Sequence, residues 1–354
     1  MVKAKARLLR IVSLSEARPN LPARTLFHAG PPYQAERPTV ILKSAAQAAV
    51  LAGWAADDSE AIRLLESDNI RLEPAQDHGF AVPLAMVLAP TMWCVEVGDA
   101  SSVFLTAMSE GPPPALRFGS SAPECRHRAR DWCAKAAAVI NSRLDRVPPI
   151  EDMIAAAVED GDECHALTSA GNQLFVEVLG DIPRAIRDDL LSNAGFSLSI
   201  WMAWSGWKLR SSESAIEAIG GNGVHFGWRP RGERAWRTTL APCPTGTFFK
   251  QERSAFGLGA IGDSAVVDIC GLGGQALRFA PKLLDEWSQF LPPNMKARHN
   301  GILDSETGIV SPDLVVQTGL GPIVNLAIVD REGGGFPIGR GIFLVPPALF
   351  TTGN

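Results

Sequence analysis

The sequence is short of the features that mark disulfide-bonded, membrane-spanning and nucleic-acid-binding proteins. Its six cysteines include no C-x-x-C pair, so reduced thiols are expected rather than a disulfide framework. The longest weakly charged run, residues 80–95, contains Pro83 and Pro90 and is too short to span a bilayer. The net charge is -5 and no basic stripe with interleaved aromatics is present, which argues against nucleic acid as a partner.

Familiar catalytic and targeting motifs are also missing. The sequence holds no G-x-S-x-G, H-E-x-x-H or Walker A element. It shows no fixed-period repeat and no low-complexity tract. Residues 1–20 are basic, but their apolar core is too short and too interrupted for a signal peptide. We therefore expect a cytoplasmic protein without a membrane partner.

What remains is an ordinary globular composition with segregated helices and strands. The chain has 354 residues, of which 46% are hydrophobic and 20% charged. Apolar residues recur at helical spacing in residues 39–66 and 123–209, whereas residues 70–105 and the region after Glu217 favour strands. This predicts an α+β fold with two mixed α/β lobes and a helical domain between them. The predicted domains are residues 1–120, 121–212 and 213–354.

A glycine motif near residue 260 has the spacing of a dinucleotide-binding turn. Gly257, Gly259 and Gly262 match G-x-G-x-x-G, which requires a strand before the first glycine and a helix at the third. Here a charged segment precedes the motif, and the β-branched content of residues 263–270 predicts a strand after it. No dinucleotide, and no other cofactor, is expected.

A second glycine cluster follows that predicted strand. Gly271, Gly273 and Gly274 would connect it to a helix predicted over residues 275–290. The N–H groups at a helix N-terminus can hold a carboxylate or a phosphate. The alternative is that these glycines only permit a tight turn.

Three polar residues are close together in the predicted helical region. Asp162, Glu163 and His165 would fall within one helical turn and could supply a general base. Asp162 and His165 would share a face while Glu163 points elsewhere, which does not favour a metal site. The alternative is a helix cap formed by Asp160 or Asp162.

Two further histidines lie in predicted loops beside strand ends. Asp77 and His78 precede an apolar strand, and His28 precedes Gly-Pro-Pro. Each histidine is an acid–base candidate, or else a hydrogen-bonded structural residue. Farther along the chain, residues 201–207 carry a tryptophan at every third position, which is typical of a core or a subunit interface.

Six segments, taken in order, resemble the AllG (YlbE-like) family across about residues 25 to 350. They are residues 26–39, 73–90, 158–175, 219–232, 261–281 and 316–341. The resemblance implies mixed α/β lobes with a small helical domain. It also implies work beside an FdrA-type subunit, AllF, and a third subunit, AllH, as in an oxamate carbamoyltransferase. That enzyme exchanges oxalurate plus phosphate for oxamate plus carbamoyl phosphate.

The same resemblance implies a single site to which all of the matching segments contribute. The residues that carry over as catalytic are His28, Asp162, Glu163 and His165, with Asp77 and His78 added from the loop argument. Those that carry over as substrate-binding are Gly30, Asn222, Asp263, Ser264, Gly273, Gly274 and Asn325.

This chain departs from the family pattern at three places. Typical members begin with a further Rossmann-like domain, which this sequence lacks. Their run of histidines is represented only by His78, and their Asn-Arg-Asn run by Ala166, Leu167 and Thr168. The missing arginine would be a bidentate clamp for a carboxylate or phosphate, which leucine cannot replace.

These observations support one main hypothesis and two alternatives. The main one is a homo-oligomeric AllG-like enzyme or enzyme subunit that acts on the carbamoyl or amide group of a small ureido or amide acid. The first alternative is a non-catalytic partner subunit of an FdrA-like complex. The second is a metal-dependent amide hydrolase using Asp77, His78, Asp162 and His165.

Overall fold

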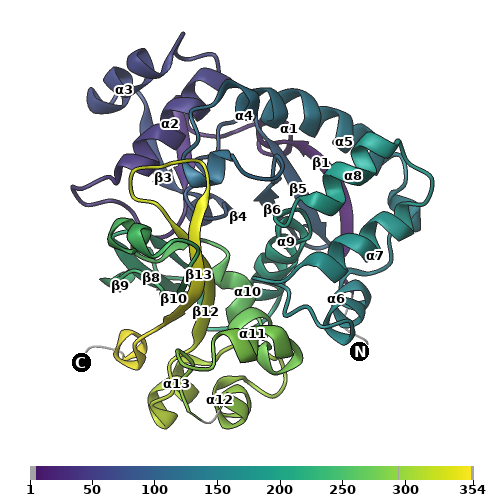
Figure 1. Cartoon of the computed structure of the whole chain (residues 1–354), viewed down its shortest axis with the longest axis vertical. Coiled ribbons are helices and arrows are strands. Elements are labelled where there is room, and N and C mark those ends of the chain that lie inside the picture. The colour runs from purple at the N-terminus through teal and green to yellow at the C-terminus, as the bar shows by residue number, and fades with distance from the viewer. Residues whose placement is uncertain (1–4, 294, 352–354) are drawn as a thin grey trace.

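The strands of the protein form several small sheets rather than one large one. The computed structural model describes residues 5–293 and 295–351 (Figure 1). Within this part the strand orders are β1-β5-β6-β4, β10-β13-β12, β11-β7-β8-β9 and β2-β3. The strands are β1 Arg7–Ser13, β2 Thr25–His28, β3 Arg71–Pro74, β4 Phe80–Ala81, β5 Trp93–Gly98, β6 Val103–Ala107, β7 Ile216–Asn222, β8 His225–Pro230, β9 Arg237–Leu240, β10 Thr245–Phe248, β11 Ile261–Gly262, β12 Ile323–Val329 and β13 Pro337–Leu344.

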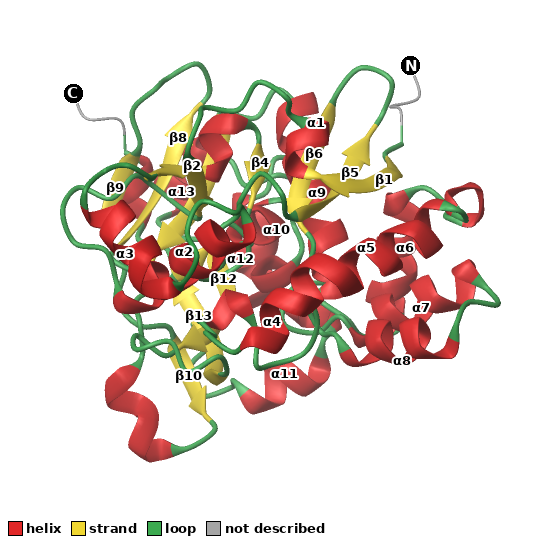
Figure 2. Cartoon of the chain, turned by 90° about the horizontal axis from the view of Figure 1, so that it is seen from above, coloured by secondary structure: helices red, strands yellow, loops and turns green. Residues whose placement is uncertain are grey.

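Several helices are gathered on one side of the molecule. Figures 1 and 2 both place α5 to α8 together, away from β8 and β9. The helices are α1 Leu14–Ala17, α2 Thr39–Leu51, α3 Asp58–Glu66, α4 Pro123–His127, α5 Cys133–Asn141, α6 Ile150–Glu159, α7 Ser169–Leu179, α8 Arg184–Ser192, α9 Phe196–Ser211, α10 Ala265–Ile269, α11 Pro281–Glu286, α12 Met295–Ile302 and α13 Pro312–Thr318.

Local sequence explains where several helices begin and end. Asp57 accepts a hydrogen bond from the Glu60 N–H at 2.8 Å and so caps α3, while Glu60 accepts one from the N–H of Ala56, the residue before this cap. Helix α13 starts with Pro at its first turn and stops at Gly319, whose φ of 66° is left-handed.

Helix α9 lies at the centre of the molecule and contacts β5, β6 and α10. Its tryptophans Trp201, Trp204 and Trp207 are all buried. The tryptophan stripe therefore belongs to the core of the chain, as one of the two interpretations expected. A helix that is apolar on every side is typical of a buried core helix.

The α+β fold predicted from the sequence is confirmed, but two predicted elements are wrong. Residues 265–269, expected as a strand, form helix α10, and the single helix expected over residues 275–290 is interrupted. A short apolar run that is buried on all sides has no polar face to fix its period, so strand and helix cannot be told apart. Pro281 begins helix α11 and so interrupts the helix that was expected over residues 275–290.

Strands β1 and β2 lie before the two regions in which strands were expected. Conversely, residues 85–90 were expected as a strand and are a buried loop.

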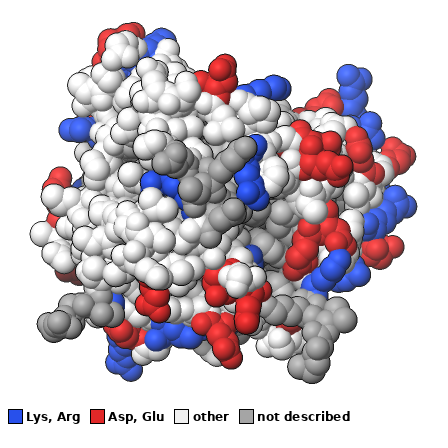
Figure 3. All heavy atoms as spheres, turned by 90° about the horizontal axis from the view of Figure 1, so that it is seen from below, with Lys and Arg blue, Asp and Glu red and all other residues white. Residues whose placement is uncertain are grey.

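In the described part of the chain, no helix has the length and apolarity needed to cross a membrane. Figure 3 shows a face on which acidic and basic side chains are interspersed along one side and sparse on the other.

Candidate active site at the two ends of helix α10

A buried aspartate just before α10 ties this helix to three segments of the first lobe. Oδ1 of Asp263 accepts hydrogen bonds from the Gly30 N–H at 2.8 Å and from Nε2 of Gln76 at 2.7 Å. Oδ2 accepts one from the Val82 N–H at 2.9 Å. Burial raises the pKa of Asp263 to about 7, against the lowering effect of these donors. Asp263 therefore changes charge near neutral pH.

The loop that follows β2 is pressed directly against strand β7. Gly30 has a φ of +72°, and a Cβ on it would lie 2.4 Å from the backbone carbon of Gly221. The Tyr33 hydroxyl donates to the Asn222 carbonyl at 2.7 Å, and Nδ2 of Asn222 donates to the Pro31 carbonyl at 2.9 Å. Gly30 thus allows the close backbone approach, and Asn222 holds the loop through its carbonyl and its side-chain amide.

Two buried polar atoms near this loop have no partner among the described residues. Nδ1 of His28 bonds the Ala29 carbonyl at 2.8 Å, which leaves Nε2 of His28 unpartnered, as is Oγ of Ser264. Burial lowers the pKa of His28 to about 4. The imidazole is therefore neutral at pH 7, with a free ring nitrogen.

At the other end of α10, an aspartate holds a histidine from the loop between α6 and α7. Nδ1 of His165 and Oδ2 of Asp268 are 2.8 Å apart. Oδ1 of Asp268 accepts from the N–H groups of Gly274 at 2.7 Å and Asn325 at 3.0 Å. This arrangement fixes the ring, so that Nε2 of His165 is the nitrogen left for chemistry.

Charge around His165 outweighs the effect of its burial. Burial lowers the pKa of His165, but the negative charge of Asp268, the hydrogen bond to it and the nearby Glu163 raise the pKa above its ordinary value. A positively charged His165 next to a carboxylate can give up a proton at Nε2 and take it back.

Glu163 organises the loop that carries His165. Its carboxylate accepts from the N–H groups of His165 at 2.8 Å, Ala166 at 2.5 Å and Leu167 at 3.2 Å. It also accepts from Nδ2 of Asn325 at 2.9 Å. Burial raises the pKa of Glu163. Its hydrogen bonds mark it as a residue that positions the loop.

The glycines after α10 use their N–H groups within the protein. The Gly273 N–H donates to the Glu163 carbonyl at 2.7 Å, and the Gly274 N–H donates to Asp268. The corner that was expected to hold a substrate anion therefore holds an internal carboxylate in this structure. Gly273 and Gly274 act by positioning Glu163 and Asp268.

Three predicted residues lie outside these two groups. Asp162 accepts from the Gly171 N–H at 2.8 Å and caps α7, which is the alternative that the sequence left open. The expectation that Asp162, Glu163 and His165 share one helical turn is wrong, because the segment is a loop with Cys164 at a φ of 69°. His78 pairs with Glu73 at 2.7 Å, and Asp77 lies 3.3 Å from Arg229.

The metal-hydrolase alternative requires that its four proposed ligands lie together. Its four proposed ligands, Asp77, His78, Asp162 and His165, each have a different partner. Over the described ranges, no group of three or more His, Cys, Asp or Glu residues is arranged to hold a metal ion.

Asp268, the partner of His165, was not among the site residues predicted from the sequence. It lies in the same segment as Asp263 and was taken for a residue of a strand. Its position five residues after Asp263 would have been informative only if the segment had been recognised as a helix.

Comparison with known proteins now places the chain in a family. The sequence model of the AllG family, described as "Oxamate carbamoyltransferase subunit AllG", matches residues 70–264. Because this match covers more than half of the 354 residues, the chain belongs to the AllG family. The expected family is therefore confirmed.

Individual relatives match along nearly the whole chain. Oxamate carbamoyltransferase subunit AllG of Escherichia coli is 28% identical over 92% of this chain and 87% of its own length. Uncharacterized protein YahG of the same organism is 27% identical over 94% of this chain and 78% of its own. A crystal structure of a conserved protein of unknown function from Enterococcus faecalis has a TM-score of 0.87 at 24% identity. The match covers 98% of this chain and 92% of the chain in that crystal structure, which supports the fold.

Proposed function

We propose that the chain acts on the carbamoyl or amide group of a small ureido or amide acid, as an AllG-type subunit of an oxamate carbamoyltransferase-like enzyme. The observation that carries the proposal is the buried His165–Asp268 pair, in which Nδ1 of His165 is engaged at 2.8 Å. The family name of the matching model and of the Escherichia coli relative supplies the reaction class.

In this proposal His165 moves the proton that the reaction requires. Phosphate oxygen attacks the carbamoyl carbon of a ureido acid, the bond from that carbon to the amide nitrogen breaks, and the nitrogen takes a proton. A positively charged His165 supplies this proton from Nε2, and in the reverse direction the same nitrogen accepts it. Asp268 positions the ring and stabilises its charge.

The name of the Escherichia coli relative describes a subunit, so we propose that full activity needs an FdrA-like partner chain in the cytoplasm and an oligomeric assembly. No metal or other cofactor enters the proposed steps. The division of the chain at about residues 120 and 212 also remains a proposal.

The test is an assay of the purified chain, alone and co-expressed with an FdrA-like partner. The substrates are oxalurate with phosphate and oxamate with carbamoyl phosphate. His165→Gln and Asp268→Asn should each lower kcat about 100- to 10,000-fold, the usual worth of a positioned acid–base group. The exposed His127, replaced by Gln, is the matched control.

The outcomes separate the enzyme from its non-catalytic alternative. If the complex turns over and folded His165→Gln and Asp268→Asn complexes keep that rate, the chain is a non-catalytic partner subunit. If neither preparation turns over any of these substrates, the proposed substrate class is wrong.

A further inference from the structure

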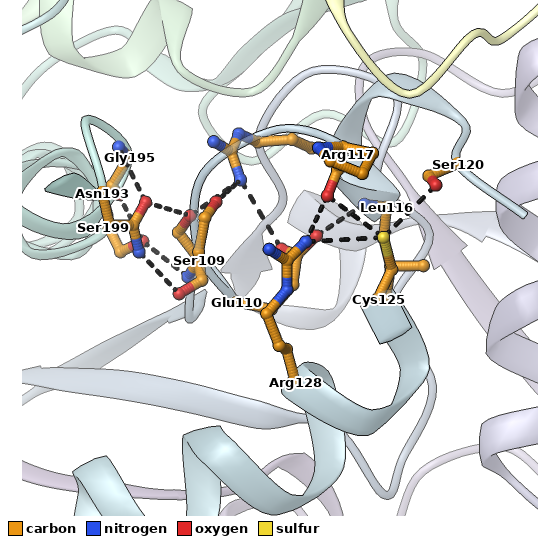
Figure 4. A network of polar contacts seen from close by, with 12 residues as sticks. Ser109, Glu110, Leu116, Arg117, Ser120, Cys125, Arg128, Asn193, Gly195 and Ser199 are labelled. Atoms are coloured by element: carbon orange, nitrogen blue, oxygen red, sulfur yellow. Dashed lines mark hydrogen bonds and ion pairs between the residues drawn. The ribbon is translucent and has the colours of Figure 1, made fainter. Parts of the chain in front are cut away.

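A second buried polar network lies in the loop that follows β6, at residues 109–120. Glu110 and Arg117 come from this loop and are only 1% and 5% exposed. Arg128 reaches them from the helix that follows α4. Figure 4 shows the side chains of Arg117 and Arg128 close to that of Glu110.

This network carries more positive than negative charge. Nη1 of Arg117 donates to Oγ of Ser109 at 2.9 Å and to the Gly111 carbonyl at 2.8 Å, and lies 3.6 Å from Oε2 of Glu110. Arg128 donates to the Pro114 carbonyl. The cluster therefore holds two guanidinium groups and one carboxylate, and Arg117 and Glu110 form an ion pair within it. A buried excess charge is costly unless a counter-charge is supplied, and an anionic ligand would supply one.

Both a donor and an acceptor are left over in this network. Oε2 of Glu110 and Nε of Arg128 are buried and have no hydrogen-bond partner among the described residues. A molecule that carries an N–H donor beside a carboxylate would satisfy both of these atoms.

The network is attached to both ends of the candidate active site. The Arg117 carbonyl accepts from the Ala85 N–H at 3.1 Å, in the loop that begins at Val82 and its bond to Asp263. On the other side, Oγ of Ser109 donates to Oδ1 of Asn193 at 3.0 Å. Thr168 follows His165 in the same loop. Its Oγ1 donates to the carbonyl of Ala194, the residue after Asn193, at 2.5 Å.

We propose that Arg117 and Arg128 hold the carboxylate of a small amide acid, while Glu110 accepts a hydrogen bond from its amide N–H. This inference rests on the proposed function for its substrate class. It assigns to Arg117 and Arg128 the clamp that residues 166–168 do not provide. Arginine suits this task because its planar fork matches a carboxylate.

The first experiment measures dissociation constants by calorimetry for oxamate and for oxamide, its neutral diamide. The wild-type chain, with its partner where one is needed for stability, should bind oxamate more tightly than oxamide. Arg117→Gln and Arg128→Gln should weaken oxamate binding about 10- to 100-fold, as expected for a lost charge-assisted hydrogen bond. Oxamide binding should change little.

Two variants guard against simple misfolding. Arg117→Lys keeps the charge without the fork and should weaken oxamate binding by less than Arg117→Gln does. Arg130→Gln removes an exposed arginine nearby and should change neither ligand. Circular dichroism and the melting temperature report whether each variant is folded.

The second experiment looks for a gain of binding, which a damaged fold cannot produce. Oxalate has a second carboxylate where oxamate has its amide, so Glu110 should repel it. Glu110→Gln should therefore tighten oxalate binding and reduce or reverse the preference for oxamate over oxalate.

The proposal is overturned if wild type binds none of these carboxylates at millimolar concentration. It is also overturned if folded Arg117 and Arg128 variants keep wild-type oxamate affinity, even when carbamoyl transfer is observed. Arg117-dependent binding without any transfer would instead leave the carboxylate site standing and contradict the proposed function.

Discussion

Asp263 accepts hydrogen bonds from three separate segments, namely from the N–H groups of Gly30 and Val82 and from the amide of Gln76, which also donates to the Ile219 carbonyl. Asp263→Ala would remove the carboxylate that accepts from these buried donors. We expect a loss of about 3–5 kcal/mol in the free energy of unfolding, at about 1–3 kcal/mol for each unsatisfied group, measured by urea denaturation.

Asp263→Asn keeps one acceptor oxygen and should fall between Asp263→Ala and wild type. Asp188→Ala removes an exposed carboxylate and is the matched control, with an expected change within about 0.5 kcal/mol. Equal stability of Asp263→Ala and Asp188→Ala would show that the three segments are held by other contacts.

The His165–Asp268 pair should make stability depend on pH. The pKa of His165 is raised in the folded state, so its contribution is fully present below the unfolded pKa of about 6.5. It is lost as the pH rises through the folded pKa. The difference in unfolding free energy between wild type and His165→Gln should therefore be larger at pH 6 than at pH 9.

Asp263, whose pKa is also raised, changes wild-type stability in the same direction. Comparison with His165→Gln removes this contribution, because that variant keeps Asp263. A difference that stays constant between pH 6 and pH 9 would mean that His165 titrates alike in the folded and unfolded chain.

At this scale the sequence was informative about polar loops and uninformative about the apolar segment that joins them. Glu163 and His165 could be selected because polar residues clustered between apolar helices are candidates for a functional site. Arg117 could not be selected, because nothing in its sequence neighbourhood indicates that it is buried beside Glu110.

Among the elements, the turn after β2 offers a clean test of close backbone approach. Gly30→Ala would place a Cβ 2.4 Å from the Gly221 backbone at a φ of +72°. We expect it to cost about 2–5 kcal/mol, the sum of left-handed strain and overpacking. The measurement is chemical denaturation.

Gly53→Ala is the matched control, because Gly53 has a φ of +71° but no atom within 4 Å of the added Cβ. It should show only the strain, about 1–2 kcal/mol. If both substitutions cost the same, the approach of the β2 turn to β7 is looser than the structure shows.

Most of the secondary structure was predictable from the spacing of apolar residues and from the content of β-branched residues. The helices in residues 39–66 and 123–209 and the strands β3, β5, β6, β8, β9, β12 and β13 were all expected. Helix α10 was not, because its residues are buried throughout. Tertiary packing, rather than local preference, decides the conformation of such a segment.

For the molecule as a whole, one buried apolar cluster runs through all three predicted domains. It extends from Ala6 through Ile200 to Phe350. The Gly335 carbonyl also accepts from the Ala115 N–H at 2.9 Å, which joins the last lobe to the first. We therefore expect one cooperative unfolding transition, with equal calorimetric and van't Hoff enthalpies. Two resolved calorimetric peaks would show that the lobes unfold separately.

Helix α10 gives the candidate active site a property that neither end of the helix has alone. Asp263 and Asp268 are fixed to one short rigid segment, yet each is bonded to a different part of the chain. A ligand that displaces one end must displace the other. Binding at the His28–Gly30 side and binding at His165 should therefore be energetically linked, each changing the affinity of the other by the same factor.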